Sequence, residues 1–308
     1  MKHIHPSPSK HLFLALGAAS LLLLAHPAPA SVVDLGQAGQ FALLALGGGI
    51  DDSGPLGPQG QPYSVKGPVG VVTSGEKFQA SGSVNYNGPI YLHSGVTFNS
   101  SAPGVPQPTM SASIDALLAQ AKQDAFSGAA AALQLGMNPT ATYGTINSDF
   151  TISQANTGHY VFNINTVNFS GGKELTLNGT QGSTFLLNVS GSIALTPGSI
   201  VLTGGLTSDN VLINYSGNQN IRLTGGGNTS KIFGTILAPN ANVVLSPGFV
   251  AGSIIANAIT MSSGADVVPV PELTPSSVLF GFLGLVVAIG SRRAISGRVY
   301  ARSNRPTK

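Results

Sequence analysis

The 308-residue chain contains no cysteine and no tryptophan, and only 8% of its residues are charged. Without cysteine it can form no disulfide and no thiolate metal site. Acid–base hydrolysis of a glycan needs two placed carboxylates, and acidic residues are too sparse here to indicate such a pair. Once the leader is set aside, only His93 and His159 remain, too far apart in sequence to predict a zinc site. We therefore expect a non-enzymatic protein without metal or cofactor.

Long apolar runs are also scarce, and the two that occur lie near the ends of the chain. At the N-terminus, Lys2 and Lys10 precede an apolar stretch at residues 12–25, and the small residues Ala28 and Ala30 follow it. This order is typical of a secretory signal peptide cleaved after Ala30. We assign residues 1–30 to that leader, and we expect the rest of the chain to work outside the cytoplasm.

The C-terminal segment, residues 268–308, has the order of a membrane-entering tail. A proline-rich spacer with one acid precedes an apolar run at residues 278–290 and a basic pair; the spacer and basic residues are Pro269, Pro271, Glu272, Arg292 and Arg293. As a helix the apolar run would span only ~20 Å, short of the ~30 Å hydrocarbon core. The pattern resembles the PEP-CTERM sorting signal, which implies an exosortase-like sorting enzyme as partner, although Leu273 replaces the second proline. An ordinary C-terminal membrane anchor is the alternative.

Between the two targeting segments the charge changes sign. Residues 31–267 hold six basic and ten acidic side chains, so this core carries about 6 − 10 = −4, and the basic isoelectric point near 9.2 belongs to the ends. Binding to nucleic acid requires a basic patch. The core has none in its sequence, so we expect no nucleic-acid partner.

Short β-type runs bounded by Gly, Asn or Ser fill residues 145–263. The turn pattern N-x-S-G opens at Asn168, Asn188 and Asn214, with spacings of 20 and 26 residues. A second corner, Leu followed by Thr or Ser and then Gly, recurs at residues 195–198, 202–205, 223–226 and 245–248, with a weaker copy at 261–264. Corners recurring about every 20 residues predict a mainly β fold, a right- or left-handed β-solenoid in which a column of Asn or Thr can stack. An antiparallel sandwich with similar turns is the alternative.

Residues 111–135 have a helical pattern instead. Apolar residues fall on one stripe, Ser113 can cap the start, Asp115 suits the first turn and Gly136 ends the element; the stripe is Ile114, Leu117, Leu118, Ala121, Ala125, Ala129, Ala132 and Leu133. We expect this helix along the flank of a single domain at residues 31–267. Before it, residues 51–62 are expected to form a polar loop, in which Asp51 and Asp52 are solvated and hold no calcium.

The most specific motif lies in the segment from Ile232 to Val243 and comprises Gly234, Leu237, Ala238, Pro239 and Asn240. This segment resembles the choice-of-anchor A family of bacterial adhesive domains, and the likeness extends loosely over residues 33–264. The resemblance implies a secreted, surface-anchored protein and supplies no catalytic residue.

Three functions fit these features. We expect an adhesin of the cell envelope or extracellular matrix that contacts exopolysaccharide or another surface. Ice binding is the alternative, since secreted ice-binding proteins also combine a solenoid with one helix, but the T-x-T pattern of ice faces occurs only at Thr140-Ala141-Thr142. A passive coat protein is the third possibility.

Overall fold

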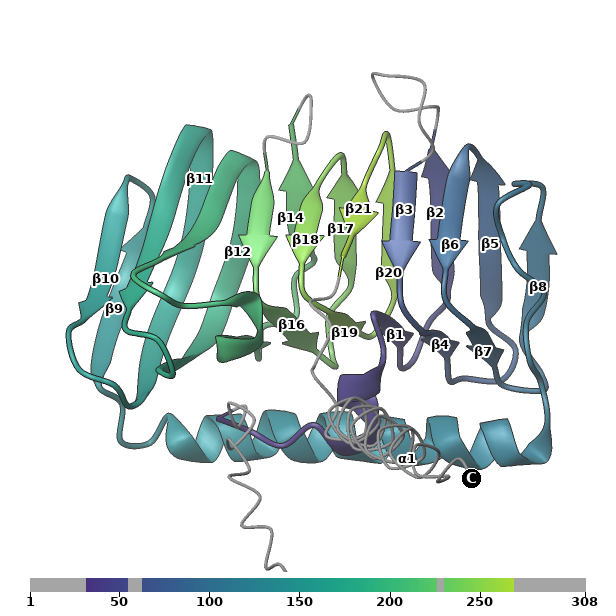
Figure 1. Ribbon diagram of the computed structural model, residues 1–308, viewed down its shortest axis with the longest axis horizontal. Coiled ribbons are helices and arrows are strands. Elements are labelled where there is room, and N and C mark those ends of the chain that lie inside the picture. The colour runs from purple at the N-terminus through teal and green to yellow at the C-terminus, as the bar shows by residue number, and fades with distance from the viewer. Residues whose placement is uncertain (1–31, 55–62, 226–229, 269–308) are drawn as a thin grey trace, which may run out of the picture.

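The computed structural model describes residues 32–54, 63–225 and 230–268. They form a three-sided solenoid with one long helix, α1, along its flank (Figure 1). All strand pairings in the described residues are parallel. The prediction of a β-solenoid with a flanking helix is therefore confirmed, and the antiparallel alternative is wrong.

We name the three sides faces A, B and C and give their strands in spatial order. Face A consists of β9 (Ala141–Ile146), the first part of β11 (His159–Gly179), the first part of β12 (Thr184–Thr203), β13 (Val211–Tyr215), β16 (Thr235–Ala238), β19 (Ile254–Ala256), β1 (Leu43–Ala45), β4 (Val69–Val71) and β7 (Ile90–Leu92). Face B consists of the middle parts of β11 and β12, then β14 (Ile221–Thr224), β17 (Val243–Ser246), β20 (Ile259–Ser262), β2 (Ile50–Gly54), β5 (Lys77–Gly82) and β8 (Thr97–Ser100). Face C consists of β10 (Phe150–Gln154), the ends of β11 and β12, β15 (Lys231–Phe233), β18 (Phe249–Ala251), β21 (Asp266–Val267), β3 (Tyr63–Lys66) and β6 (Val84–Asn87). Two short 3-10 helices, η1 (Gly36–Gln40) and η2 (Ser208–Asn210), complete the described elements.

The coils do not stack in sequence order. The first strands β1, β2 and β3 pair with the last strands β19, β20 and β21, so the first and last described coils meet in the middle of the stack. From there the chain winds to one end at β7 and β8, crosses to the other end through α1, and winds back (Figure 1). The helix is therefore the link between two half-solenoids.

Helix and solenoid match in length. The 24 residues of α1 (Ala112–Leu135) extend about 36 Å at 1.5 Å per residue. The nine strand segments of face A span about 38 Å at ~4.8 Å per interval. One helix of this length can cover the whole face, and Figure 1 shows it doing so.

The core is a stack of apolar columns, because alternate residues of each strand point inward. One column of face A contains one buried residue from each of eight strands, namely Phe162, Leu187, Ile213, Ile236, Ile254, Leu43, Val69 and Ile90. None of these side chains is more than 1% exposed. Without disulfides, stability rests on such columns and on the backbone hydrogen bonds between coils.

The start of α1 differs from the prediction in its cap. The Ser111 hydroxyl, not that of Ser113, accepts a hydrogen bond from the Ile114 amide at 3.3 Å, because Ser111 has the extended backbone that a cap requires. Asp115 lies in the first turn and Gly136 follows the last, as expected. Leu118, Ala121, Ala125 and Ala132 are buried against face A, whereas Leu133 is 45% exposed, so its place on the buried stripe is wrong.

A column of asparagines fastens the C-terminal half of α1. Asn163, Asn188 and Asn214 are in register on face A. The amide of Asn163 donates to the Gly136 carbonyl at 2.7 Å, that of Asn188 to the Ala132 carbonyl at 2.8 Å, and that of Asn214 to Asn188 Oδ1 at 2.8 Å. The Gly136 carbonyl lies beyond the last turn, where a helix leaves carbonyls without amide partners. The Ala132 carbonyl accepts the Asn188 bond in addition to the Gly136 amide at 3.1 Å. The predicted Asn column is confirmed.

The predicted corners are real, but their period is not uniform. Four of the Leu-Thr or Leu-Ser type corners, at residues 195–198, 223–226, 245–248 and 261–264, begin where face B ends. The corner at 202–205 instead follows face C. The N-x-S-G turns at Asn188 and Asn214 follow face A, whereas the one at Asn168 follows face B. Equivalent positions 170, 196, 224, 246 and 262 are 26, 28, 22 and 16 residues apart, because loops of different length join short strands.

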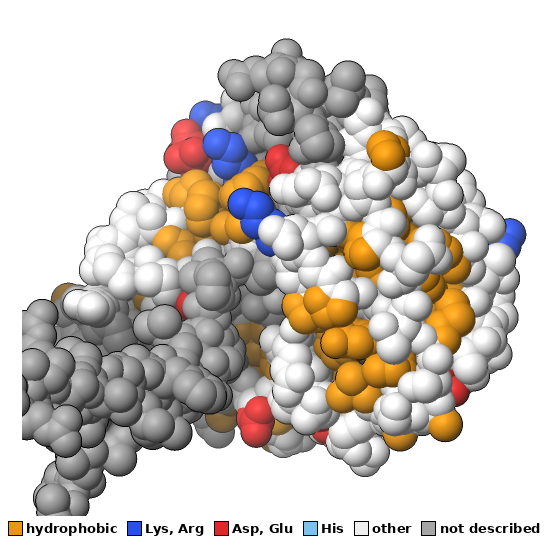
Figure 2. Space-filling model, turned by 45° about the vertical axis from the view of Figure 1, so that its right-hand side comes forward, with side chains coloured by type: hydrophobic (Ala, Val, Ile, Leu, Met, Phe, Trp, Pro, Cys, Tyr) orange, Lys and Arg blue, Asp and Glu red, His pale blue; other side chains and the backbone are white. Residues whose placement is uncertain are grey.

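The two ends of the solenoid are finished differently. Residues 101–110 close the end at β8, with bridges at Gly104 and Thr109. Pro103, Pro106 and Pro108 lie in this cap and have no amide hydrogen for a further strand. Figure 2 brings this end forward and shows charged side chains mainly at its margins. At the other end, Tyr143 and Phe150 close the core with ring centroids 5.2 Å apart.

Candidate binding surfaces

A ladder of hydroxyl groups runs along face B, and we name it the hydroxyl ladder. Its seven members are, in order, Ser170, Thr196, Thr224, Ser246, Ser262, Ser53 and Ser81. Each is the outward residue at the corner after face B, since its neighbours Leu195, Leu223, Leu245 and Met261 point into the core. Six intervals of ~4.8 Å give the ladder a length of about 29 Å.

Members of the ladder bond to one another. The Thr224 hydroxyl donates to that of Thr196 at 3.2 Å, and the Ser262 hydroxyl donates to that of Ser246 at 2.8 Å. A hydroxyl carries one donor and two acceptor positions, so each member keeps hydrogen-bonding capacity for an external partner. The ladder can therefore offer a repeating set of neutral polar contacts.

The outward column beside the ladder is mixed. It comprises Asn168, Ala194, Arg222, Val244, Thr260, Asp51, Gln79 and Asn99. Arg222 and Asp51 put charge into it, and Val244 puts in an apolar side chain. A hollow of about 310 Å³ beside this column is also charged, since Asp51, Glu76 and Lys77 line it. Face B thus repeats in one column and varies in the next.

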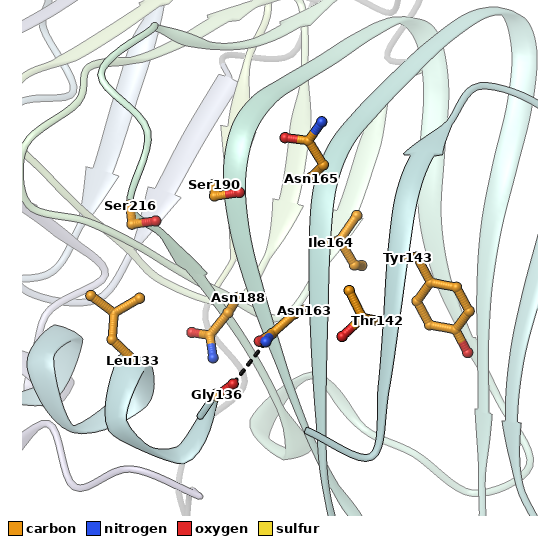
Figure 3. A pocket seen from close by; sticks show the side chains of 10 residues that line it. All are labelled: Leu133, Gly136, Thr142, Tyr143, Asn163, Ile164, Asn165, Asn188, Ser190 and Ser216. Atoms are coloured by element: carbon orange, nitrogen blue, oxygen red, sulfur yellow. Dashed lines mark hydrogen bonds between the residues drawn. The ribbon is translucent and has the colours of Figure 1, made fainter. Parts of the chain in front are cut away.

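A second hollow lies beside the C-terminal end of α1, and we name it the helix-end groove (Figure 3). It has a volume of about 280 Å³. Its lining residues come from the C-terminal end of α1, its C-cap and neighbouring coils: Leu133, Gly136, Thr142, Tyr143, Asn163, Ile164, Asn165, Asn188, Ser190 and Ser216. No charged residue is among them. The groove is thus a neutral, amide- and hydroxyl-lined site.

The predicted polar loop is wrong at its start. Residues 50–54 form strand β2, and Asp52 points into the core with 4% exposure. The Tyr86 hydroxyl donates to Asp52 Oδ2 at 2.8 Å, which makes burial of the carboxyl tolerable. Burial raises the pKa of Asp52 to about 7, with a smaller rise from the nearby Asp51 and Asp266, and the Tyr86 bond opposes the shift. Burial alternates along β2, as is typical of a strand: Ile50, Asp52 and Gly54 are buried, and Asp51 and Ser53 are exposed. In the sequence, the neighbouring Gly and Pro residues indicated a loop instead.

The residues of the family motif form corners and core contacts of the solenoid. Gly234 turns the corner from face C to face A with φ of 137°, where a Cβ would lie 2.9 Å from the Val211 carbonyl oxygen. Leu237 packs against α1 and Ala238 faces the core. Pro239 is buried and Asn240 is exposed at the next corner. These residues shape the solenoid and do not converge on either candidate surface.

The remaining predicted positions give no catalytic site. His93 accepts a hydrogen bond from the Gly95 amide, and His159 bonds the Thr184 hydroxyl at 2.6 Å. Within the described ranges no group of three His, Cys, Asp or Glu could hold a metal, and no helix there is long and apolar enough to cross a membrane. The signal-cleavage and sorting residues lie outside the described part of the chain, namely Ala28, Ala30, Pro269, Pro271, Glu272, Arg292 and Arg293.

Several solved ice-binding proteins resemble this chain in fold. An ice-binding protein from an Antarctic Flavobacteriaceae bacterium is 19% identical, with a TM-score of 0.52 over 79% of this chain and 48% of that one. The ice-binding protein of an Arctic yeast is 18% identical, with a TM-score of 0.48 over 79% and 96% of the two chains. The DUF3494 domain of a Shewanella frigidimarina ice-binding protein is 20% identical, with a TM-score of 0.49 over 78% and 98%.

No curated protein matches the chain. A family model does, over residues 36–267, which is well over half of the sequence and nearly all of the described solenoid. The expectation of an adhesive-type domain is confirmed at this level. The chain belongs to the family described as "Putative Ice-binding-like adhesive domain".

Proposed function

We propose that this protein is a non-enzymatic adhesin of the cell envelope or extracellular matrix, and that face B contacts polysaccharide. The hydroxyl ladder is the observation that carries this proposal. Polysaccharides present rows of hydroxyls, and a rigid row of Ser and Thr can exchange hydrogen bonds with several sugar units at once. Each contact is weak, and avidity comes from their number.

The mixed column strengthens the choice of polysaccharide over ice. A flexible glycan chain tolerates Arg222, Val244 and Asp51 beside the ladder, because it can shift its contacts from coil to coil. An ice lattice is rigid and periodic, so it requires regularity in both directions of the contacting surface. Face B is regular along one column only.

The test is co-sedimentation of the purified chain with the producer's envelopes and exopolysaccharide. We expect saturable binding that soluble glycan competes away, and that the double substitution Thr196→Val with Thr224→Val weakens. Thr176→Val on face C is the matched control, because Thr176 is in register with a native valine, Val201. Binding that the double variant leaves intact would reject face B as the contact surface. If no saturable binding occurs at all, the passive coat role replaces adhesion.

We also propose that the chain reaches the surface through its ends. The leader at residues 1–30 supports export, and the spacer, apolar run and arginine pair after Val268 support anchoring in a membrane before an exosortase-like enzyme processes the tail. The choice-of-anchor A and PEP-CTERM resemblances support this arrangement from sequence alone.

Ice binding is the second candidate function, and two observations favour it. The ladder repeats at the strand spacing over about 29 Å, and the family description itself is ice-binding-like. The T-x-T pattern adds little, because Thr140 directly precedes β9 and Thr142 lies in it, on face A and away from the ladder. The measurement is the shape of ice crystals grown in the purified chain. Faceted crystals that become rounded with Thr196→Val and Thr224→Val would support ice binding, and unmodified growth would reject it.

A further inference from the structure

We propose that the helix-end groove is a binding site for one neutral sugar unit of a glycan, distinct from the hydroxyl ladder. This inference rests on the proposed adhesin function and gives it a selective site. The groove lies between α1 and the corner from face A to face B, so it occupies a different side of the solenoid from the ladder (Figure 3).

The polar groups of the groove fall into two sets. Asn163 and Asn188 use their amide nitrogens to hold the Gly136 and Ala132 carbonyls of α1. In contrast, the side chains of Thr142, Asn165 and Ser190 are exposed and make no hydrogen bond within the described residues. The first set fixes the groove wall, and the second set is available to a ligand.

A register shift places the available groups. Asn165 interrupts the pairing of β11 with β12, since Ile164 pairs with Val189 while Thr166 pairs with Ser192. Ser190 and Gly191 therefore oppose the single residue Asn165, which is the pattern of a β-bulge. Bulges re-aim side chains and are common beside binding sites. Here the bulge brings an amide and a hydroxyl to the groove from neighbouring coils.

The lining also has an apolar component. Leu133, a large apolar residue, is 45% exposed at the edge of the groove. Amides and hydroxyls next to an apolar surface match a sugar ring, which has hydroxyls on its rim and C–H groups on its faces.

Charge and size narrow the ligand class. None of the ten lining residues is ionisable near neutral pH, so an anionic sugar acid would find no cation to compensate its desolvation. The volume of about 280 Å³ leaves room for one sugar ring. A neutral hexose or N-acetylhexosamine unit, at the end or within a chain, fits both limits.

The test is titration of the purified chain with neutral oligosaccharides (cello-, malto-, manno- and chito-oligomers) against oligogalacturonate as the acidic comparison, followed by NMR or calorimetry. We expect at least one neutral oligomer to bind saturably and to shift the backbone signals of Asn165 and Ser190. Ser190→Tyr, which fills the groove, and Asn165→Leu should each weaken binding about tenfold. Asn156→Leu is the matched control, because Asn156 is an exposed asparagine in the turn between β10 and β11, outside both the groove and face B.

The outcomes separate this inference from the adhesin function. If no neutral oligomer binds, the groove site is overturned. It is also overturned if Asn165→Leu and Asn156→Leu change binding equally while both variants keep the wild-type melting temperature. Equal or tighter binding of oligogalacturonate at the groove overturns the neutral ligand class. In each case, saturable binding of the same preparations to exopolysaccharide would leave the adhesin function standing. If only the ladder variants lose this exopolysaccharide binding, adhesion is assigned to face B.

Discussion

Replacing the buried Asp52 by asparagine should change how the stability of this protein depends on pH. The carboxyl is 4% exposed, and its pKa in the folded protein is raised from 3.8 to about 7, chiefly by burial. Between these two values the folded chain keeps a proton that the unfolded chain has released. Folding stability must therefore fall as pH rises through this window.

The magnitude follows from the shift. A difference of about 3 pKa units at ~1.4 kcal/mol each predicts that Asp52 lowers the free energy of unfolding by about 4 kcal/mol between pH 4 and pH 8. Asparagine has nearly the same shape and can still accept the Tyr86 hydrogen bond, but it does not titrate. We expect Asp52→Asn to be similar to the wild type near pH 4.5 and more stable by several kcal/mol at pH 8.5.

The assay is urea unfolding of both chains at a series of pH values, followed by far-UV circular dichroism because the chain has no tryptophan. The informative quantity is the difference between variant and wild type, which cancels the titration of other groups. Asp51→Asn is the control: Asp51 is the exposed neighbour on β2, and its removal leaves the buried carboxyl and most of the pH dependence in place. Parallel curves for Asp52→Asn and wild type would refute the reasoning.

Three further predictions concern the helix, its approach to face A and the tail. Asn188→Ala should cost about 1–2 kcal/mol in urea unfolding, because it removes two buried hydrogen bonds, to the Ala132 carbonyl and from the Asn214 amide, whereas Asn218→Ala at an exposed turn should cost little. Gly70→Ala should lower the free energy of unfolding by about 1–3 kcal/mol, since its Cβ would lie 2.8 Å from Leu44 Cδ1 and Phe41 Cε1. Gly144→Ala, whose Cβ would have no atom within 4 Å, should be near neutral, and equal melting temperatures of the two variants would contradict this. Ending the chain after Val268 should move the protein from the cell-associated fraction into the medium, and continued retention in cell fractionation would argue against tail anchoring.

The sequence was sufficient to predict what local chemistry decides. Short apolar runs, Gly corners and a 3.6-residue stripe each depend on neighbours a few residues away, and they predicted a solenoid with one flanking helix. The Asn column was also predictable, because Asn188 and Asn214 begin the same corner on successive coils. The cap at Ser111 was missed by two residues, which is the usual uncertainty of helix ends.

What the sequence could not predict is decided by distant pairing. Leu43 packs against Ile254 and Asp52 against Met261, and no local pattern relates these positions. The split order of the coils therefore escaped prediction, and with it the burial of Asp52 at the join. The exposure of Leu133 depends on where the solenoid ends relative to α1, which helical periodicity alone does not report.

The hydroxyl ladder raises a question of cause, because the fold itself favours it. Each coil leaves face B through a corner where a short polar side chain before a glycine suits the turn, and stacking the coils then aligns those side chains without any need for a ligand. The hydrogen bonds from Thr224 to Thr196 and from Ser262 to Ser246 fit this structural origin. If the ladder is purely structural, the double variant Thr196→Val with Thr224→Val should be less stable but should bind polysaccharide as the wild type does. A functional ladder predicts the reverse, since valine keeps the β-branched shape and each lost hydroxyl pair costs the fold only about 1 kcal/mol. Measuring unfolding and polysaccharide binding on the same variant therefore decides whether the corners serve the fold alone or also the surface.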